Sequence, residues 1–129
     1  MDKKVFVNFS NHKSGLWNEK QKESALKYGE EIVDMDFPVV DPDLNSDEVS
    51  QLGDTCINKI LSLPVAAVMC QGESTLSFYV VNRLIEKGIV CLAACSRRVV
   101  KERVIDGVSI RESQFEFERF REYRRAAPG

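Results

Sequence analysis

The sequence predicts a single α/β domain built on a short parallel sheet. Two unbroken apolar runs, residues 65–70 and 89–95, support this prediction. Such runs between helical segments are typical of central parallel strands covered on both faces. Strand-like and helix-like segments also alternate along the chain, as in βαβ units. The 129 residues fit one domain, assigned to residues 1–125, and residues 126–129 are expected to be a disordered tail.

The first half of the chain gives two strands and two helices. Residues 4–9 form an apolar strand, and residues 31–37 form a second one that Pro38 ends. Between them, a helix is predicted from four side chains at helical spacing, with Gly29 as its C-cap: Trp17, Gln21, Ala25 and Tyr28. The next helix begins with a capping box of Asn45 and Glu48 and extends to Leu61. Gly53 lies inside this helix without an explanation in the sequence.

The second half gives two more strands and a hairpin. Residues 65–70 and 89–95 are strands, and residues 74–87 form a buried helix that ends at Gly88. The dipeptide Asp106-Gly107 then predicts a β-hairpin of residues 98–105 and 108–117. Right-handed crossovers make the first four strands a parallel sheet, with the order 2-1-3-4. The expected fold is a three-layer, Rossmann-like domain of about four parallel strands plus a C-terminal hairpin.

Several classes of protein are disfavoured by composition and by absent motifs. The net charge is about −2, which does not favour binding to duplex nucleic acid. The sequence contains no GxGxxG, GxxxxGK[ST] or GxSxG motif. It has neither a signal-peptide pattern nor an apolar run long enough to span a membrane, so we expect a cytoplasmic protein. The four cysteines include no CxxC pair, so we predict reduced, buried thiols, with neither a metal nor a cofactor.

Three polar segments follow predicted strands and are expected to meet at one edge of the sheet. Ligands of open parallel sheets bind beyond the strand C-termini, where the strand order reverses. The candidate ligand-binding residues of these segments are Ser10, Asn11, Ser14, Gln71, Gly72, Ser74, Thr75, Ser96 and Arg98, with Trp17 as a surface for stacking a base. Ser74 or Thr75 would cap the helix that follows, and the N-terminus of this helix favours an anion.

Four side chains are candidates for chemistry. Arg97 and Lys13 would stabilise negative charge, and His12 or Glu73 would move a proton. Each also has a structural interpretation: Arg97 can begin an exposed strand, and His12 can be a surface residue without a role. Likewise, Ser74 can be only a cap, and Trp17 can be only the anchor of its helix.

The segment Val5-Phe6-Val7-Asn8-Phe9-Ser10-Asn11-His12, followed by Trp17 and Gln21, resembles a known family. It is similar to the small Rossmann-like proteins of type III CRISPR systems, which include stand-alone ring nucleases and other relatives of the CARF domain. The short α/β layout and the C-terminal hairpin with Phe117, Phe120 and Tyr123 look similar as well.

The resemblance implies a homodimer that binds a cyclic oligoadenylate messenger, above all cyclic tetra-adenylate, across its two-fold axis. It also implies that type III CRISPR signalling, a form of antiviral defence, is switched off. Relatives that cleave the ring do so without a metal, by attack of a ribose 2′-hydroxyl on the adjacent phosphate. No familiar catalytic pair is present, so a binder that does not cleave remains an alternative.

Two further functions stay open. A nucleoside hydrolase or deoxyribosyltransferase would use Glu73 as a carboxylate nucleophile. A non-catalytic binding or dimerisation module would use aromatic residues of the C-terminal hairpin as its functional surface. These aromatic residues can equally belong to the core, because one face of the hairpin must cover the sheet: Phe115, Phe117, Phe120 and Tyr123.

Overall fold

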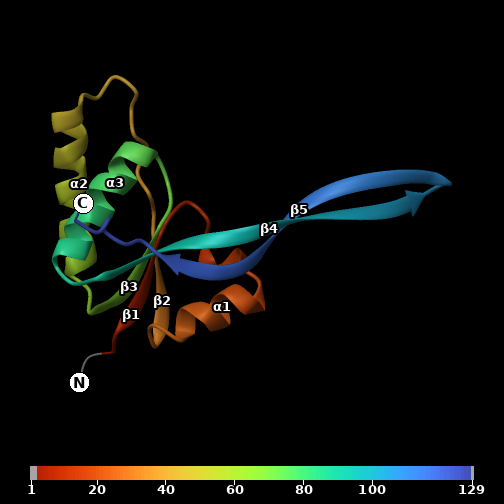
Figure 1. Ribbon diagram of the computed structural model, residues 1–129, viewed down its shortest axis with the longest axis horizontal. Coiled ribbons are helices and arrows are strands. Elements are labelled where there is room, and N and C mark those ends of the chain that lie inside the picture. Colours follow the sequence, from red (N-terminus) through yellow and green to blue (C-terminus); the bar gives the residue numbers. More distant parts are fainter. Residues whose placement is uncertain (1–2, 129) are drawn as a thin grey trace.

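The computed structural model describes residues 3–128 and shows a mixed α/β fold with a curled, five-stranded sheet (Figure 1). The strands are β1 (Val5–Phe9), β2 (Glu31–Met35), β3 (Val65–Cys70), β4 (Val90–Ile105) and β5 (Val108–Glu122). Their order in the sheet is β2-β1-β3-β4-β5. The first three contacts between neighbouring strands are parallel, and β5 pairs antiparallel with β4.

Helices cover both faces of the sheet. The short helix α1 (Glu19–Leu26) packs on one face, where Phe6, Trp17 and Leu92 form a buried cluster. The helices α2 (Ser46–Leu61) and α3 (Ser74–Glu86) cover the other face, over a larger core that includes Phe9 and Ile60. None of the described helices is long and apolar enough to cross a membrane.

The predicted strand count is wrong, and the reason lies in β4. The sequence suggested four parallel strands and a separate hairpin. Instead, β4 runs without interruption from Val90 to Ile105, so the fourth strand and the first strand of the hairpin are one element. A register shift between Cys95 and Ser96 lies where the two were expected to separate. The complete order therefore has five strands, with β5 at the edge.

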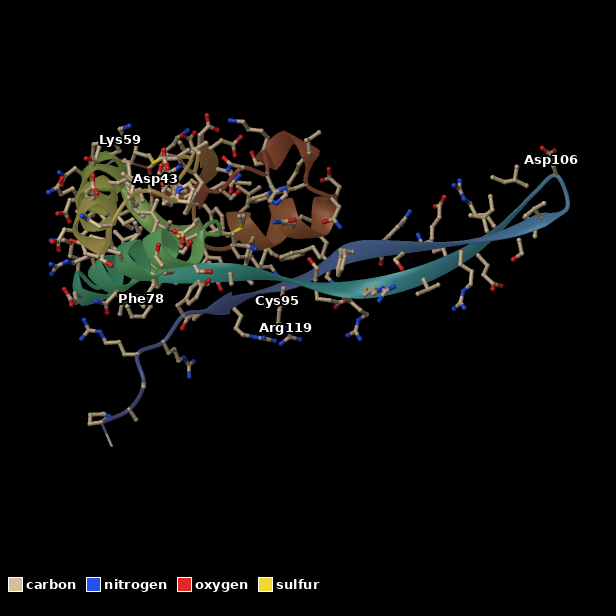
Figure 2. The ribbon with its side chains drawn as sticks, turned by 90° about the horizontal axis from the view of Figure 1, so that it is seen from above. Asp43, Lys59, Phe78, Cys95, Asp106 and Arg119 are labelled. Atoms are coloured by element: carbon tan, nitrogen blue, oxygen red, sulfur yellow. The ribbon has the colours of Figure 1, made fainter. Side chains whose placement is uncertain are left out.

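Beyond the sheet, β4 and β5 continue as a two-stranded arm, defined here as residues 97–116. Its length is about 30 Å at the usual rise per residue. Figure 2 shows the arm projecting from the body, with Cys95 near its base and Asp106 at its tip. Asp106 and Gly107 both have positive φ angles, of 51° and 78°, as the predicted two-residue turn requires.

Two glycines are explained by close approach of neighbouring groups. Gly29 is not the cap of α1, which ends at Leu26 and has Lys27 as its C-cap. A Cβ atom at Gly29 would lie 2.6 Å from the backbone nitrogen of Phe6, so glycine lets the chain pass against β1. A Cβ atom at Gly53 of α2 would overlap the ring of Tyr79 on α3. Gly53 thus allows these two helices to pack closely.

We expect Gly53→Ala to destabilise the protein by about 1–3 kcal/mol, because the added methyl group overpacks the contact with Tyr79. In an ordinary helix the same change stabilises by up to about 1 kcal/mol. Urea denaturation measures the free energy of unfolding. The control is Gly53→Ala in a Tyr79→Ala background, where the cost should disappear. Stabilisation of the protein that retains Tyr79 would contradict this account.

Candidate functional site

A pocket of about 600 Å³ lies beyond the C-terminal ends of β1 and β3, where the strand order reverses. We call it the switch pocket. Its polar wall contains Asn11, His12 and Lys13 after β1, with Gln71 after β3. Its volume falls in the range of small-molecule sites, about 300–1,000 Å³. The structure thus brings the first two predicted polar segments together at one pocket.

The rest of the wall comes from the start of α1 and the base of the arm. Asn18 and Gln21 add polar groups, and Ser96 of β4 lies opposite them. The apolar part of the wall is formed by the residues Leu16, Trp17, Met69, Ala94, Phe115 and Phe117. Leu16 is 87% exposed and Phe115 is 74% exposed, so two apolar side chains at the pocket are open to solvent.

A buried polar network holds the loop that carries His12. The Asn8 side chain is fully buried, and its Nδ2 atom donates to the carbonyl of His12 and to Asp34, each at 2.8 Å. Ser10 is also buried, and its hydroxyl donates to the Asn8 Oδ1 atom at 2.6 Å. The predicted ligand-binding residue Ser10 therefore has a structural role. Sequence reasoning missed Asn8, although a polar residue inside an apolar strand was the available signal.

Asp34 extends this network to the far side of the loop. Its carboxylate accepts hydrogen bonds from the backbone N–H of Ser14 at 3.1 Å and from the Ser14 hydroxyl at 3.1 Å. Although burial favours the neutral acid, the hydrogen bonds from Asn8 and Ser14 lower the pKa of Asp34. The predicted ligand-binding residue Ser14 is thus engaged by Asp34 and is not part of the wall of the switch pocket.

Trp17 and Lys13 are fixed on either side of His12. The Trp17 indole is buried, packs edge-on against Phe6 and donates to the carbonyl of His12 at 3.2 Å. It anchors the start of α1 and leaves only part of its surface to the pocket. Lys13 forms an exposed ion pair with Asp36, and this hydrogen bond raises the pKa of the lysine. Its ammonium group is therefore charged beside the pocket.

Glu73 does not line the switch pocket. It is the N-cap of α3, and its carboxylate accepts hydrogen bonds from the backbone N–H groups of Thr75 and Leu76, both at 2.9 Å. These bonds lower the pKa of Glu73, which disfavours a role as a proton donor at neutral pH. The expectation that Ser74 or Thr75 caps this helix is wrong. The carboxylate of Glu73 already occupies the position that an anion would take.

The remaining residues of this turn are also engaged within the protein. Thr75 donates its hydroxyl to Glu73 at 2.7 Å. A Cβ atom at Gly72 would lie 2.5 Å from ring atoms of Phe37, so the close approach that requires glycine here is to a core side chain. Ser74 and Gly72 line a smaller hollow of about 360 Å³ beside Phe78 and Tyr123. Gln71 lines both this hollow and the switch pocket, and its Oε1 atom accepts from the backbone of Ala94 at 2.9 Å.

The third predicted polar loop does not exist, because Ser96, Arg97 and Arg98 lie within β4. Their partners in β5 are Phe117, Glu116 and Phe115, in that order. Successive side chains of a strand point to opposite faces, so only one of the two arginines can share the face of Ser96. Arg97 instead pairs with Glu118 at 3.1 Å. Arg98 lies on the face of Ser96, two residue pairs further out along the arm, and donates to the Ser113 hydroxyl at 2.9 Å.

None of the four cysteines lines the switch pocket. All four cysteines are free, and Cys56, Cys70 and Cys91 are buried. Burial raises the pKa of the Cys70 and Cys91 thiols to about 12, so both are inert as nucleophiles at neutral pH. Within residues 3–128, no group of three or more His, Cys, Asp or Glu side chains is arranged to hold a metal ion.

The fold and the pocket define a class: a mixed α/β protein whose polar pocket lies at the C-terminal edge of its sheet, beneath a projecting two-stranded arm. The chain belongs to the uncharacterized protein MJ1673 family, whose model matches residues 4–121. No curated protein and no solved structure matches the chain.

Proposed function

We propose that this protein binds a cyclic oligoadenylate in the switch pocket. The observation that carries the proposal is the combination of polar groups and an exposed aromatic ring in one pocket. Lys13 offers a positive charge for a phosphate, and Phe115 offers an open ring on which a base can stack. His12, Asn18 and Gln21 add hydrogen-bonding groups for base edges and riboses.

Three further features support this proposal. The sheet order, with crossover helices on both faces, agrees with a Rossmann-like domain, in which ligands bind where the strand order reverses. The sequence resemblance to ring nucleases falls on β1 and the loop that follows it, and Asn11 and His12 of this loop line the pocket. The four free thiols are consistent with the reducing environment of the cytoplasm.

His12 and Lys13 would be the catalytic residues for cleavage of the ring, because Glu73 and Arg97 do not line the pocket. The ribose 2′-oxygen would attack the adjacent phosphorus and lose its proton to His12. The bond from phosphorus to the 5′-oxygen would break and this oxygen would take a proton from water, to which His12 then returns its own, which leaves a 2′,3′-cyclic phosphate and a 5′-hydroxyl. Lys13 would stabilise the charge on the phosphorane. This reaction needs no metal and no cofactor.

Binding is tested by thermal unfolding and calorimetry with cyclic tri-, tetra- and hexa-adenylate. A ring at about 100 times its dissociation constant should stabilise the protein by roughly 2.7 kcal/mol. Chromatography of the recovered nucleotide then separates cleavage from binding alone. The absence of any stabilisation by all three rings would overturn the proposal.

We expect Lys13→Ala to weaken ring binding by about 10–100-fold, because a hydrogen bond to a charged group contributes roughly 1.5–3 kcal/mol. Calorimetry gives the dissociation constants. The matched control is Lys59→Ala on α2, which Figure 2 shows on the far side of the body from the arm. Equal affinity for the Lys13→Ala variant and the control would exclude Lys13 from the site. Loss of cleavage with retained binding in His12→Ala would assign His12 to the chemical step.

The alternative of a nucleoside hydrolase or deoxyribosyltransferase finds less support. It needs the Glu73 carboxylate free to attack a ribose, but both oxygens accept hydrogen bonds from the first turn of α3. The third alternative, a dimerisation module, is favoured by one specific observation, the exposed apolar residues of the arm.

A further inference from the structure

One face of the arm carries side chains that the described part of the chain leaves uncovered. Its two strands pair along their length, and side chains alternate between two faces. Because Ser96, Phe115 and Phe117 all line the switch pocket, the face that continues from them is called the pocket-side face. The register assigns it these residues: Arg98, Val100, Glu102, Val104, Ser109, Arg111, Ser113 and Phe115.

Charges divide unequally between the two faces of the arm. On the opposite face, Lys101 pairs with Glu116 at 3.5 Å, and Arg103 pairs with Glu112. On the pocket-side face, Glu102 and Arg111 approach each other at 3.8 Å. Arg98 lies on this same face and has no carboxylate partner among residues 3–128. The pocket-side face therefore carries an unpaired cation.

Apolar side chains on the same face are open to solvent. Val100, Val104 and Phe115 are 46%, 74% and 74% exposed. On the other face, the most exposed apolar residues gather only at the tip, as Ile105, Val108 and Ile110. A two-stranded ribbon is at best marginally stable in water without a surface to pack on. The pocket-side face therefore needs a partner that covers three apolar side chains and pairs with one cation.

We propose that a second copy of this chain covers this face, with the two arms antiparallel and their pocket-side faces in contact across a two-fold axis at Val100. The charges select this register. Arg98 lies opposite the partner's Glu102, and Phe115 lies opposite the partner's Arg111. Val100 meets the partner's Val100.

In neighbouring registers, the side chains of the two faces do not complement each other. With the two-fold axis halfway towards the Glu102 row, Val100 faces the partner's Glu102, and Arg98 faces the partner's Val104. With the axis at Glu102, this carboxylate faces its own copy. Like charges that meet at an interface are strongly disfavoured, whereas the register centred on Val100 places opposite charges across from one another. The arm is also nearly neutral, with five basic and four acidic residues between Arg97 and Glu116, which lets two copies approach.

This arrangement completes the site with a residue of the second copy. The partner's Val104 lies opposite Ser96, beside the switch pocket, and the partner's Ser109 lies opposite Phe117. The two pockets lie at opposite ends of the paired arms, about 27 Å apart along the strands. Only this part of the inference rests on the proposed function. It predicts one ring for each chain, in place of the single shared ring that the resemblance implied.

The test uses two charge reversals and their mixture, with no ligand present. The contact covers roughly 300 Å² on each arm, well below the 800 Å² or so of a standard interface, so we expect a micromolar dissociation constant. Arg98→Glu places two carboxylates opposite each other, and Glu102→Arg places two guanidinium groups opposite each other. Each variant alone should raise the dimer dissociation constant at least tenfold. An equimolar mixture should restore dimers, because both opposing pairs are then of opposite charge.

Sedimentation equilibrium from about 1 to 300 μM gives the mass, and circular dichroism checks that each variant is folded. Val100→Lys should also disrupt the dimer, while Val99→Lys, the same change on the opposite face, should not. A wild-type protein that stays monomeric throughout this range would overturn the proposal, as would folded single variants whose mixture stays monomeric. Failure of ring binding in an intact dimer would instead overturn only the proposed function.

Discussion

Phe6→Ala should lower the free energy of unfolding by about 3–5 kcal/mol, which is the usual cost of emptying a large aromatic site in a core. The Phe6 side chain is fully buried in β1, and its ring contacts Trp17, Tyr28 and Phe120 with centroid distances of 6.2, 6.2 and 5.1 Å. The cost is large relative to the 5–15 kcal/mol that stabilises a typical domain. Denaturant titration of the wild type and the variant measures this change in the free energy of unfolding.

The consequences should extend from the core to the site. Trp17 lines the switch pocket, and Phe120 lies in the part of β5 that pairs with the body of the sheet at the base of the arm. The lost Phe6 ring therefore removes a packing contact from both residues. Phe78→Ala is the matched control, because Phe78 is 75% exposed. Figure 2 labels this residue on α3. We expect that control to change stability by no more than about 0.5 kcal/mol. Similar costs for the two variants would show that Phe6 does not organise this core.

Where the sequence carries a strong local signal, the structure agrees with it. The apolar run of β3 has the predicted bounds, and the capping box of Asn45 and Glu48 is present, with hydrogen bonds of 2.9 and 3.1 Å. Gly88 ends α3 with a φ of 79°, the left-handed conformation that favours glycine at a helix end. These features depend on residues close together in the chain, so sequence patterns can predict them.

The features that sequence reasoning missed depend on contacts between distant residues. Ser96 and Arg97 look like a loop because their side chains are polar, yet β5 pairs with them and keeps them in a strand. The capping role of Glu73 went unnoticed because Ser and Thr are the more usual caps. Leu16 and Asn18 lie just before α1 and Phe115 lies on β5, and only the folded chain brings these two segments to one pocket.

The position of the candidate site could be predicted from the sequence more readily than the residues that line it. The rule that ligands bind where the order of parallel strands reverses predicted the edge of the sheet at which the switch pocket lies, because it depends only on topology. Which side chains face the pocket depends on register and on hydrogen bonds inside the loops. Asn11, His12, Lys13 and Gln71 line it as expected, whereas Glu73 is engaged elsewhere.

The Asn8 network requires a neutral amide, because the side chain at this position must both donate and accept hydrogen bonds. Its Nδ2 atom donates to Asp34 and to the carbonyl of His12, while its Oδ1 atom accepts from Ser10. An aspartate of the same shape can only accept when it is ionised. It would also bring a second carboxylate to within hydrogen-bonding distance of Asp34 in a buried position. This substitution keeps the volume of the side chain and changes only its charge and its hydrogen bonding.

Asn8→Asp should therefore destabilise the protein by about 3 kcal/mol or more at neutral pH, and the loss should shrink as the pH falls. The introduced carboxyl group has a raised pKa in the folded state, so folding takes up protons and stability increases on acidification. In the wild type, the lowered pKa of Asp34 has the opposite effect, because its contribution is lost as the pH falls through the folded-state value. Denaturant titrations between pH 4 and 8 would show the two curves converge towards acid, with Asn58→Asp on the exposed side of α2 as the matched control. A deficit that is independent of pH would mean that lost packing, and not charge, explains the effect.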